Sequence, residues 1–164
     1  MKKVLMVCLG NICRSPSAEA ILQKMIQSSN LKDKVLVDSA GTSGYHEGQP
    51  ADQRMRASAL ERGYELLSRS REFVVNDFDE YDHIFAMDKS NLKNILSLAR
   101  NDKDKKKVKL ILDFTPDQEI REVPDPYYGG DQGFFKVIDL LEESCLKIVD
   151  FLAEENFPVN NNRN

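Results

Sequence analysis

The sequence predicts an α/β fold, a three-layer sandwich in which a four-stranded parallel sheet is flanked by helices. Four short apolar runs are typical of strands that are buried on both faces. They alternate with segments in which apolar residues recur every three or four positions, as in amphipathic helices. The length of 164 residues fits one domain. We expect this domain to span residues 1–155, followed by a frayed tail over 156–164.

The first strand is predicted over Val4–Leu9, where a continuous apolar run ends at Gly10. A helix is predicted from Ser15, which is a suitable N-cap and precedes a proline, Pro16, at the first helical position. The apolar face of this helix comprises Ala18, Ile21, Leu22, Met25 and Ile26. A strand, a tight loop and a helix therefore follow one another directly.

The second strand is predicted over Val35–Ala40, followed by a glycine-containing loop over Gly41–Pro50. A helix of about 12 residues then ends at Gly63, a residue type favoured just after helices. This segment repeats the strand–loop–helix order of the first one.

The third strand is predicted over His83–Met87, before a helix that Asp88 or Ser90 can cap. The apolar face of that helix comprises Leu92, Ile95, Leu96 and Ala99. Charged residues dominate Asn101–Lys107, which predicts a solvated connection, and Val108–Leu112 is the fourth apolar run.

The last helix is predicted from about Asp131, after a segment punctuated by Pro116, Pro124 and Pro126. Its apolar face comprises Phe134, Ile138, Leu141, Cys145, Ile148, Val149 and Leu152.

In a parallel sheet of this kind, ligands bind beyond the carboxyl ends of the strands. The loop after the first strand is therefore the first candidate site.

Composition excludes several classes of protein. The formal net charge of −4 disfavours a general nucleic-acid surface. The odd number of cysteines, three, indicates reduced thiols and a cytoplasmic setting. The apolar run near the N-terminus is shorter than a signal peptide requires, so we expect no targeting segment and no membrane insertion. His46 and His83 lack metal-ligand spacing with one another or with a cysteine, so no metal site is expected. No cofactor is expected either.

The loop after the first strand carries a thiol at its start, Cys8, and a guanidinium at the helix entry, Arg14. Backbone N–H groups that point inward at a helix N-terminus form an anion site. Gly10 allows close approach of the backbone, and Asn11 tolerates the left-handed conformation that such a loop needs. Arg14 can hold two phosphate oxygens at once. The pattern predicts a phosphate-binding loop.

The same electrostatic field favours the thiolate form of Cys8, which is the reactive nucleophile. Ser15 can donate a further hydrogen bond to the sulfur. The alternative is that Cys8 is a small buried core residue.

The segment Val7–Pro16, which reads V-C-L-G-N-I-C-R-S-P, resembles the low-molecular-weight protein tyrosine phosphatases. Asp125–Tyr128, Asp38–Gly41 and Met87–Asn91 match other segments of that family in the same order. The resemblance covers nearly the whole chain. It implies the doubly wound phosphotyrosine phosphatase I-like fold, in agreement with the four strands found independently.

The resemblance implies a metal-independent phosphatase. Cys8 would attack phosphorus, Asp125 would be the general acid and base, and Arg14 would bind the phosphate. The residues implied to surround the phosphate are Leu9, Gly10, Asn11, Ile12, Cys13, Arg14 and Ser15. Taken alone, Asp125 in a proline-rich loop would more often be a turn former.

Ile12, Tyr45, Tyr127 and Tyr128 are expected to form the walls of a slot deep enough for phosphotyrosine. The alternative is that adjacent tyrosines only pack a loop. Related protein-arginine phosphatases carry threonine where this chain has Ile12, so isoleucine favours phosphotyrosine.

Asn11 and Ser39, with Ser15, are expected to brace the loop, although the first two also suit ordinary turns. Many relatives carry histidine where this chain has Ser68, so the resemblance does not carry the support of that histidine over to this chain. Cys13 is a candidate redox partner that would trap oxidised Cys8 in a disulfide. Its alternative is a core residue, the role we also expect for Cys145.

Two competing functions share this loop. Thioredoxin-coupled arsenate reductases need a further cysteine pair near the third strand, where this chain reads H-I-F-A-M-D. A phosphoprotein-binding module would bind phosphate without turnover. The presence of both Cys8 and Asp125 favours the enzyme.

The expected partners are tyrosine-phosphorylated proteins or peptides, with inorganic phosphate or another oxyanion as product or inhibitor. The protein is expected to be a monomer.

Overall fold

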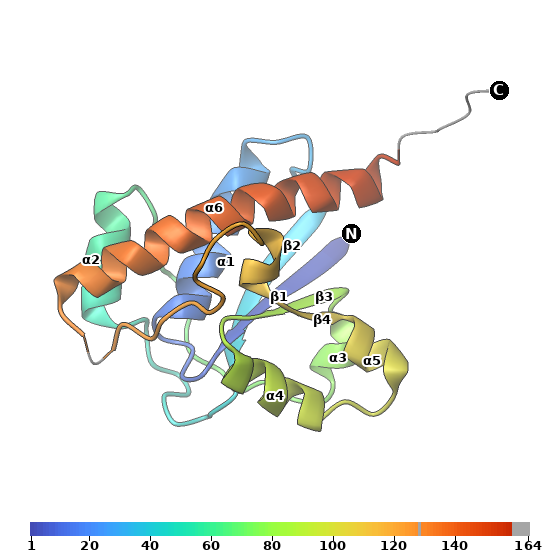
Figure 1. Cartoon of the computed structure of the whole chain (residues 1–164), viewed down its shortest axis with the longest axis horizontal. Helices are drawn as coiled ribbons and strands as arrows, with labels where there is room; N and C mark the ends of the chain where they lie inside the picture. Colours follow the sequence, from blue (N-terminus) through green and yellow to red (C-terminus); the bar gives the residue numbers. More distant parts are fainter. Residues whose placement is uncertain (128, 159–164) are drawn as a thin grey trace.

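A four-stranded parallel sheet forms the centre of the protein in the computed structural model, which describes residues 1–127 and 129–158 (Figure 1). The strands lie in the order β2-β1-β3-β4. Their bounds are Lys2–Cys8 for β1, Val35–Gly41 for β2, His83–Ala86 for β3 and Val108–Leu110 for β4. The predicted fold class is confirmed, because each predicted apolar run overlaps one strand of this sheet.

Helices cover both faces of the sheet (Figure 1). One face packs against α1 (Arg14–Gln27) and α6 (Asp131–Asn156), with α2 (Gln53–Glu61) beside α6. The other face carries α3 (Asp77–Glu80) and α4 (Lys89–Ser97), and α5 (Asp102–Lys106) precedes β4. A short 3-10 helix, η1 (Ile111–Phe114), follows β4.

The central strand β1 anchors both halves of the core. Val4 and Met6 point to the α1 and α6 side, whereas Leu5 and Val7 point to the α3 and α4 side, and all four are fully buried. Each such side chain contributes about 1.5–3 kcal/mol through burial. This packing fixes the carboxyl end of β1, and with it the first residue of the loop, Cys8.

The structure corrects the prediction for Asn101–Lys107, which contains the helix α5 rather than only a solvated connection. The Asn101 side chain accepts a hydrogen bond from the Asp104 backbone N–H and so caps the helix. Asp104 also pairs with Arg100, at a distance of 2.8 Å. Local capping therefore produces a helix in a segment whose charge pattern alone indicated a loop.

The predicted N-cap of the first helix is wrong as well. Helix α1 begins at Arg14, so Cys13 occupies the N-cap position, without a side-chain cap bond. The Ser15 hydroxyl lies in the site instead, 3.0 Å from Cys8 Sγ. At the other end of the chain, Asn156 is the last residue of α6 rather than the first of a tail, and 159–164 lie outside the described residues.

Candidate active site

The candidate site lies at the carboxyl end of the central strand β1, where the chain turns into α1. A pocket of about 430 Å³ opens there. Its lining comes from the loop after β1, the loop after β2 and the segment before α6: Cys8, Leu9, Gly10, Ile12, Cys13, Arg14, Ser43, Tyr45, His46, Asp125 and Tyr127. All three predicted catalytic residues thus face one cavity.

The loop backbone needs two unusual features. Asn11 adopts φ of 55°, the left-handed region that asparagine tolerates better than most residues. A Cβ on Gly41, at the end of β2, would lie 2.7 Å from the Leu9 carbonyl oxygen. Only glycine therefore lets the two strand ends approach this closely.

The sulfur of Cys8 is buried and faces two hydrogen-bond partners. The Asn11 backbone N–H donates to Sγ at 3.3 Å, and the Ser15 hydroxyl oxygen lies at 3.0 Å. Donors aimed at a sulfur atom stabilise a negative charge on it. This geometry suits a nucleophile better than a core residue.

Arg14 is clamped in place although its guanidinium is almost entirely buried. Nη1 donates to Asp88 Oδ2 at 2.6 Å and to the Val123 carbonyl at 3.1 Å. Burial alone would lower the pKa of Arg14, but the charge of Cys8 and the hydrogen bond to Asp88 raise it above its usual value. The cation is therefore permanent and has a fixed direction.

Asp125 lies at the mouth of the pocket and is about one third exposed, with a side-chain value of 37%. Its Oδ1 accepts a hydrogen bond from the Tyr127 backbone N–H at 3.0 Å, and its Oδ2 lies 3.7 Å from Arg14 Nη2. The residue does form a turn, as the alternative interpretation held. The turn leaves one carboxylate oxygen directed at the guanidinium and the cavity.

The predicted bracing residues are connected to one another. Asn11 Nδ2 donates to Ser15 Oγ at 2.8 Å and to Ser39 Oγ at 3.0 Å. Ser39 in turn donates to Glu19 Oε1 at 2.9 Å. These contacts tie the loop to α1 and β2, so Asn11 and Ser39 do more than shape local turns.

The aromatic side chains lie at the rim of the pocket. Tyr45 is strongly exposed and packs edge-on against His46, with ring centroids 4.8 Å apart. Tyr127 is held by Arg54, whose Nη2 donates to the Tyr127 carbonyl at 2.9 Å and whose guanidinium stacks over the ring. Ile12 lines the cavity and is nearly buried.

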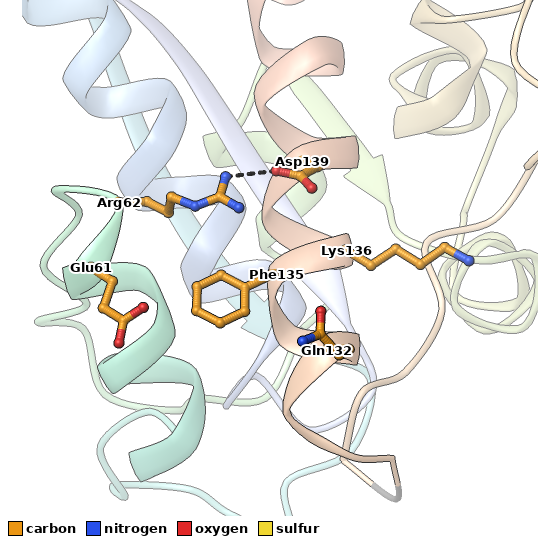
Figure 2. Close-up of a pocket in the computed structure, with 6 residues that line it drawn as sticks. All are labelled: Glu61, Arg62, Gln132, Phe135, Lys136 and Asp139. Carbon is orange, nitrogen blue, oxygen red and sulfur yellow. Dashed lines mark hydrogen bonds and ion pairs between the residues drawn. The ribbon is translucent and has the colours of Figure 1, made fainter.

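A second hollow of similar size, which we call the α2–α6 groove, lies between these two helices (Figure 2). It is lined by Glu61, Arg62, Gln132, Phe135, Lys136 and Asp139. The guanidinium of Arg62 points at Asp139, 2.7 Å away. No cysteine lines this groove.

Comparison with known proteins identifies the family. The family model described as low molecular weight phosphotyrosine protein phosphatase matches residues 3–157. The chain belongs to this family.

Relatives of this phosphatase cover almost its whole length. A putative low molecular weight protein-tyrosine-phosphatase of Synechocystis is 50% identical over 93% of this chain and 98% of its own. The human low molecular weight phosphotyrosine protein phosphatase is 38% identical, over 88% and 91%. A crystal structure of an Entamoeba histolytica protein tyrosine phosphatase, with Hepes in the active site, matches with a TM-score of 0.91 and 48% identity, over 95% and 99%.

The family contains more than one named specificity. A crystal structure described as a Drosophila arginine phosphatase matches this phosphatase with a TM-score of 0.85 and 34% identity, over 93% of this chain and 98% of the other. Membership of the family therefore leaves the choice of phosphorylated side chain to the residues of the pocket.

Sequence reasoning missed Glu19, His46 and Asp88 as site residues. Glu19 follows Ser15 by four positions, so both side chains lie on one face of α1, a spacing that was visible in the sequence. Burial raises the pKa of Glu19 to about 7. Asp88 was predicted as a helix cap, and it does cap α4, but it also holds Arg14.

The other predictions have mixed outcomes. Cys145 is fully buried in the core, as expected, whereas Cys13 is buried but also lines the pocket. Tyr128 lies outside the described residues. Within residues 1–127 and 129–158, His, Cys, Asp and Glu form no cluster suited to a metal ion, and no helix there has the length and apolar character needed to cross a membrane.

Proposed function

We propose that this chain is a protein tyrosine phosphatase that hydrolyses phosphotyrosine and aryl phosphate monoesters through a phosphocysteine intermediate. One observation carries the proposal: the sulfur of Cys8, the buried cation of Arg14 and the carboxylate of Asp125 converge on one pocket. This arrangement provides a nucleophile, an anion clamp and a proton donor at the positions that phosphoryl transfer needs.

In the first step the Cys8 thiolate attacks phosphorus in line with the departing phenolic oxygen. The P–S bond forms and the P–O bond breaks, while Asp125 gives its proton to that oxygen. Arg14 and the backbone N–H groups of residues 9–15 hold the equatorial phosphate oxygens as negative charge spreads over them. The phenol leaves neutral.

In the second step water hydrolyses the phosphocysteine. Asp125, now ionised, accepts a proton from the water as its oxygen attacks phosphorus. The P–S bond breaks, and the thiolate of Cys8 and inorganic phosphate are released. The Ser15 hydroxyl beside the sulfur stabilises the thiolate as it leaves.

Specificity for tyrosine rests on the rim. Tyr45 and Tyr127 line the same pocket as Cys8, and we expect them to form walls that let a long phenyl phosphate reach the sulfur whereas short phosphoserine does not. Ile12 gives the wall an apolar side chain, which favours a phenyl ring over the polar guanidinium of phosphoarginine. Tyr128 is proposed as a further wall on the sequence alone.

Release of phosphate from three otherwise identical peptides tests this function. We expect rapid turnover of the phosphotyrosine peptide and at least tenfold lower kcat/KM for the phosphoserine and phosphoarginine peptides. Cys8→Ser should abolish turnover, and Cys145→Ser, in the core, serves as the matched thiol control. Stoichiometric binding of the peptides without release would identify a phosphoprotein-binding module instead.

Cys13 is proposed as a redox partner for Cys8, because both thiols are free and line the same pocket. Burial raises the pKa of Cys13, so it is a neutral thiol that does not compete for phosphate. Peroxide would oxidise Cys8 to a sulfenic acid, and Cys13 would then displace water to form a disulfide. Dithiothreitol should restore activity to peroxide-treated wild type but not to peroxide-treated Cys13→Ser.

The three free thiols also suit a reducing compartment.

A further inference from the structure

A chain of hydrogen bonds leads from the sulfur of the proposed nucleophile to a carboxyl group on α1. Cys8 Sγ lies 3.0 Å from Ser15 Oγ, and Ser15 Oγ accepts from Asn11 Nδ2 at 2.8 Å. Asn11 Nδ2 also donates to Ser39 Oγ at 3.0 Å, and Ser39 donates to Glu19 Oε1 at 2.9 Å. Glu19 is the far end of this chain, opposite the sulfur.

The amide of Asn11 gives the chain its direction. Its Oδ1 accepts the Arg71 backbone N–H at 3.0 Å, so Nδ2 must face the two hydroxyl groups. Both Nδ2 hydrogens are then used, one on Ser39 and one on Ser15. Each hydroxyl is an acceptor for Asn11 and must direct its own hydrogen elsewhere.

Glu19 supplies the place for the hydrogen of Ser39. Without that acceptor, the Ser39 hydroxyl would be free to rotate, and its oxygen would hold the Asn11 amide less firmly. At the other branch, the hydrogen of Ser15 has two possible acceptors, Cys8 Sγ at 3.0 Å and the Ala40 carbonyl at 3.3 Å. A fixed Asn11 amide keeps the Ser15 oxygen beside the sulfur.

The surroundings of Glu19 leave its Oε1 available to the Ser39 hydroxyl. The carboxylate of Asp38 faces it and is held by the Tyr81 hydroxyl at 2.7 Å and by Arg71 at 3.6 Å. Among the ion pairs of the described residues, none joins a lysine or arginine to Glu19, and the Lys24 ammonium, which lines the same hollow, donates to the Gly63 carbonyl. Burial and then Asp38 raise the pKa of Glu19 to about 7, although the hydrogen bonds from the Ser39 and Ser68 hydroxyls act in the opposite direction.

We propose that Glu19 is a positioning residue for the Cys8 nucleophile, acting through Ser39 and Asn11 to hold the Ser15 hydroxyl against the sulfur. The inference rests on the proposed function and deepens it, because it concerns the same sulfur atom. Glu19 touches neither the pocket nor the phosphate, since it lines a separate hollow beside α1. Its effect on the reaction is therefore indirect.

Two substitutions separate this role from simple packing. Glu19→Gln keeps a carbonyl oxygen that can accept from Ser39, whereas Glu19→Leu fills similar space and accepts nothing. We expect Glu19→Leu to lower kcat about tenfold with KM within about twofold, as for loss of a hydrogen bond to a charged group. Glu19→Gln should restore most of kcat. The matched control is Glu65→Leu, because Glu65 is an exposed residue that lines the same hollow.

Alkylation of Cys8 by iodoacetamide at neutral pH, followed by peptide mapping, gives a readout that needs no substrate. We expect it to slow several-fold in Glu19→Leu and to recover in Glu19→Gln. If the proposed function is wrong but the inference is right, the alkylation rates will still differ in this way, although no phosphate is released from the peptide. Equal alkylation rates in wild type and Glu19→Leu would overturn the inference.

A double substitution tests the route through Ser39. If Glu19 acts through this hydroxyl, Glu19→Leu should cost little more in the Ser39→Ala background, where the link is already broken. Additive losses in kcat would show that Glu19 acts by another route. If thermal unfolding shows that Glu19→Leu does not fold, Glu19→Met replaces it. A loss of activity in Glu19→Gln as large as the loss in Glu19→Met would then also overturn the proposal.

Discussion

Two hollows of nearly the same volume, about 430 Å³ for the candidate active site and about 450 Å³ for the α2–α6 groove, each contain an arginine. In the groove, Arg62 is 39% exposed and its charge is paired with Asp139 and Glu142. In the active site, Arg14 is 3% exposed and faces the sulfur of Cys8. Volume therefore does not distinguish the two hollows, but the direction and burial of their charged groups do.

The difference is one of preorganisation. Asp88 and the Val123 carbonyl fix the guanidinium of Arg14 before any substrate arrives, so binding costs little side-chain entropy. Arg62 is held by carboxylates that water can reach, and water competes with such pairs, so they contribute little to stability. Only the first arrangement can concentrate its charge on a bound phosphate.

The largest effect is expected from Cys8→Ser, which removes the nucleophile at the floor of the active site. A serine hydroxyl is a far weaker nucleophile than a thiolate, so kcat should fall by about 10⁴-fold or more. Phosphate release from a phosphotyrosine peptide measures this loss. Inorganic phosphate should still bind, because Arg14 and the loop remain. Turnover near the wild-type rate would remove Cys8 from the mechanism.

Paired lysine substitutions compare the two arginines directly. Arg14→Lys keeps the charge but loses the planar fork that holds two oxygens, so kcat/KM should fall by about 10²–10³-fold. Arg62→Lys, in the groove, should leave kcat/KM within about twofold. Equal losses in the two variants would contradict the assignment of the phosphate site.

Asp125→Asn tests the proton donor at the mouth of the pocket. Asparagine can no longer protonate the leaving oxygen, so kcat should fall by about 10²-fold for an alkyl-substituted phenyl phosphate. The loss should be much smaller for 4-nitrophenyl phosphate, whose leaving group needs little protonation. A loss that does not depend on the leaving group would indicate that Asp125 only shapes the loop.

The part of the site that the sequence predicts is the part encoded by contiguous residues. The eight residues from Cys8 to Ser15 carry a thiol, a left-handed position and a guanidinium, so their chemistry follows from local spacing. The clamp on Arg14 comes from Asp88 and Val123, 74 and 109 positions away. Such partners depend on how strands pair in space, which no local pattern contains.

The fold, like the site, was predicted where a local sequence pattern determines it and missed where it does not. The four apolar runs predicted the sheet because buried parallel strands need apolar side chains on both faces. The helix α5 was missed because its stability comes from one cap, at Asn101, and one ion pair, between Arg100 and Asp104, in a segment with little apolar periodicity. His46 was considered only as a metal ligand, and its place on the pocket wall depends on the path of a ten-residue loop.

The burial of Glu19 predicts a pH dependence of the protein's stability. Its pKa of about 7 lies above the ordinary value of 4.5, so the folded state binds this proton more tightly than the unfolded chain. The stability that the proton provides is complete below about pH 4.5 and is lost as the pH rises through 7. Glu19→Gln should therefore lose less free energy of unfolding than wild type between pH 5 and pH 8.

With allowance for partial solvent screening, this difference should be about 1–2 kcal/mol. Urea unfolding at the two pH values measures it. Parallel pH profiles for wild type and Glu19→Gln would show that the carboxyl titrates in its ordinary range.

The smallest effect is expected from Asp139→Asn in the α2–α6 groove. The substitution removes the partner at 2.7 Å from Arg62, but the guanidinium keeps Glu142 at 3.5 Å and remains in contact with water. The free energy of unfolding and kcat/KM should therefore both stay close to their wild-type values. A loss of several kcal/mol, or a change in turnover, would mean that the groove is coupled to the active site through α6. The contrast between a fixed, buried arginine and a solvated one would then no longer separate the two hollows.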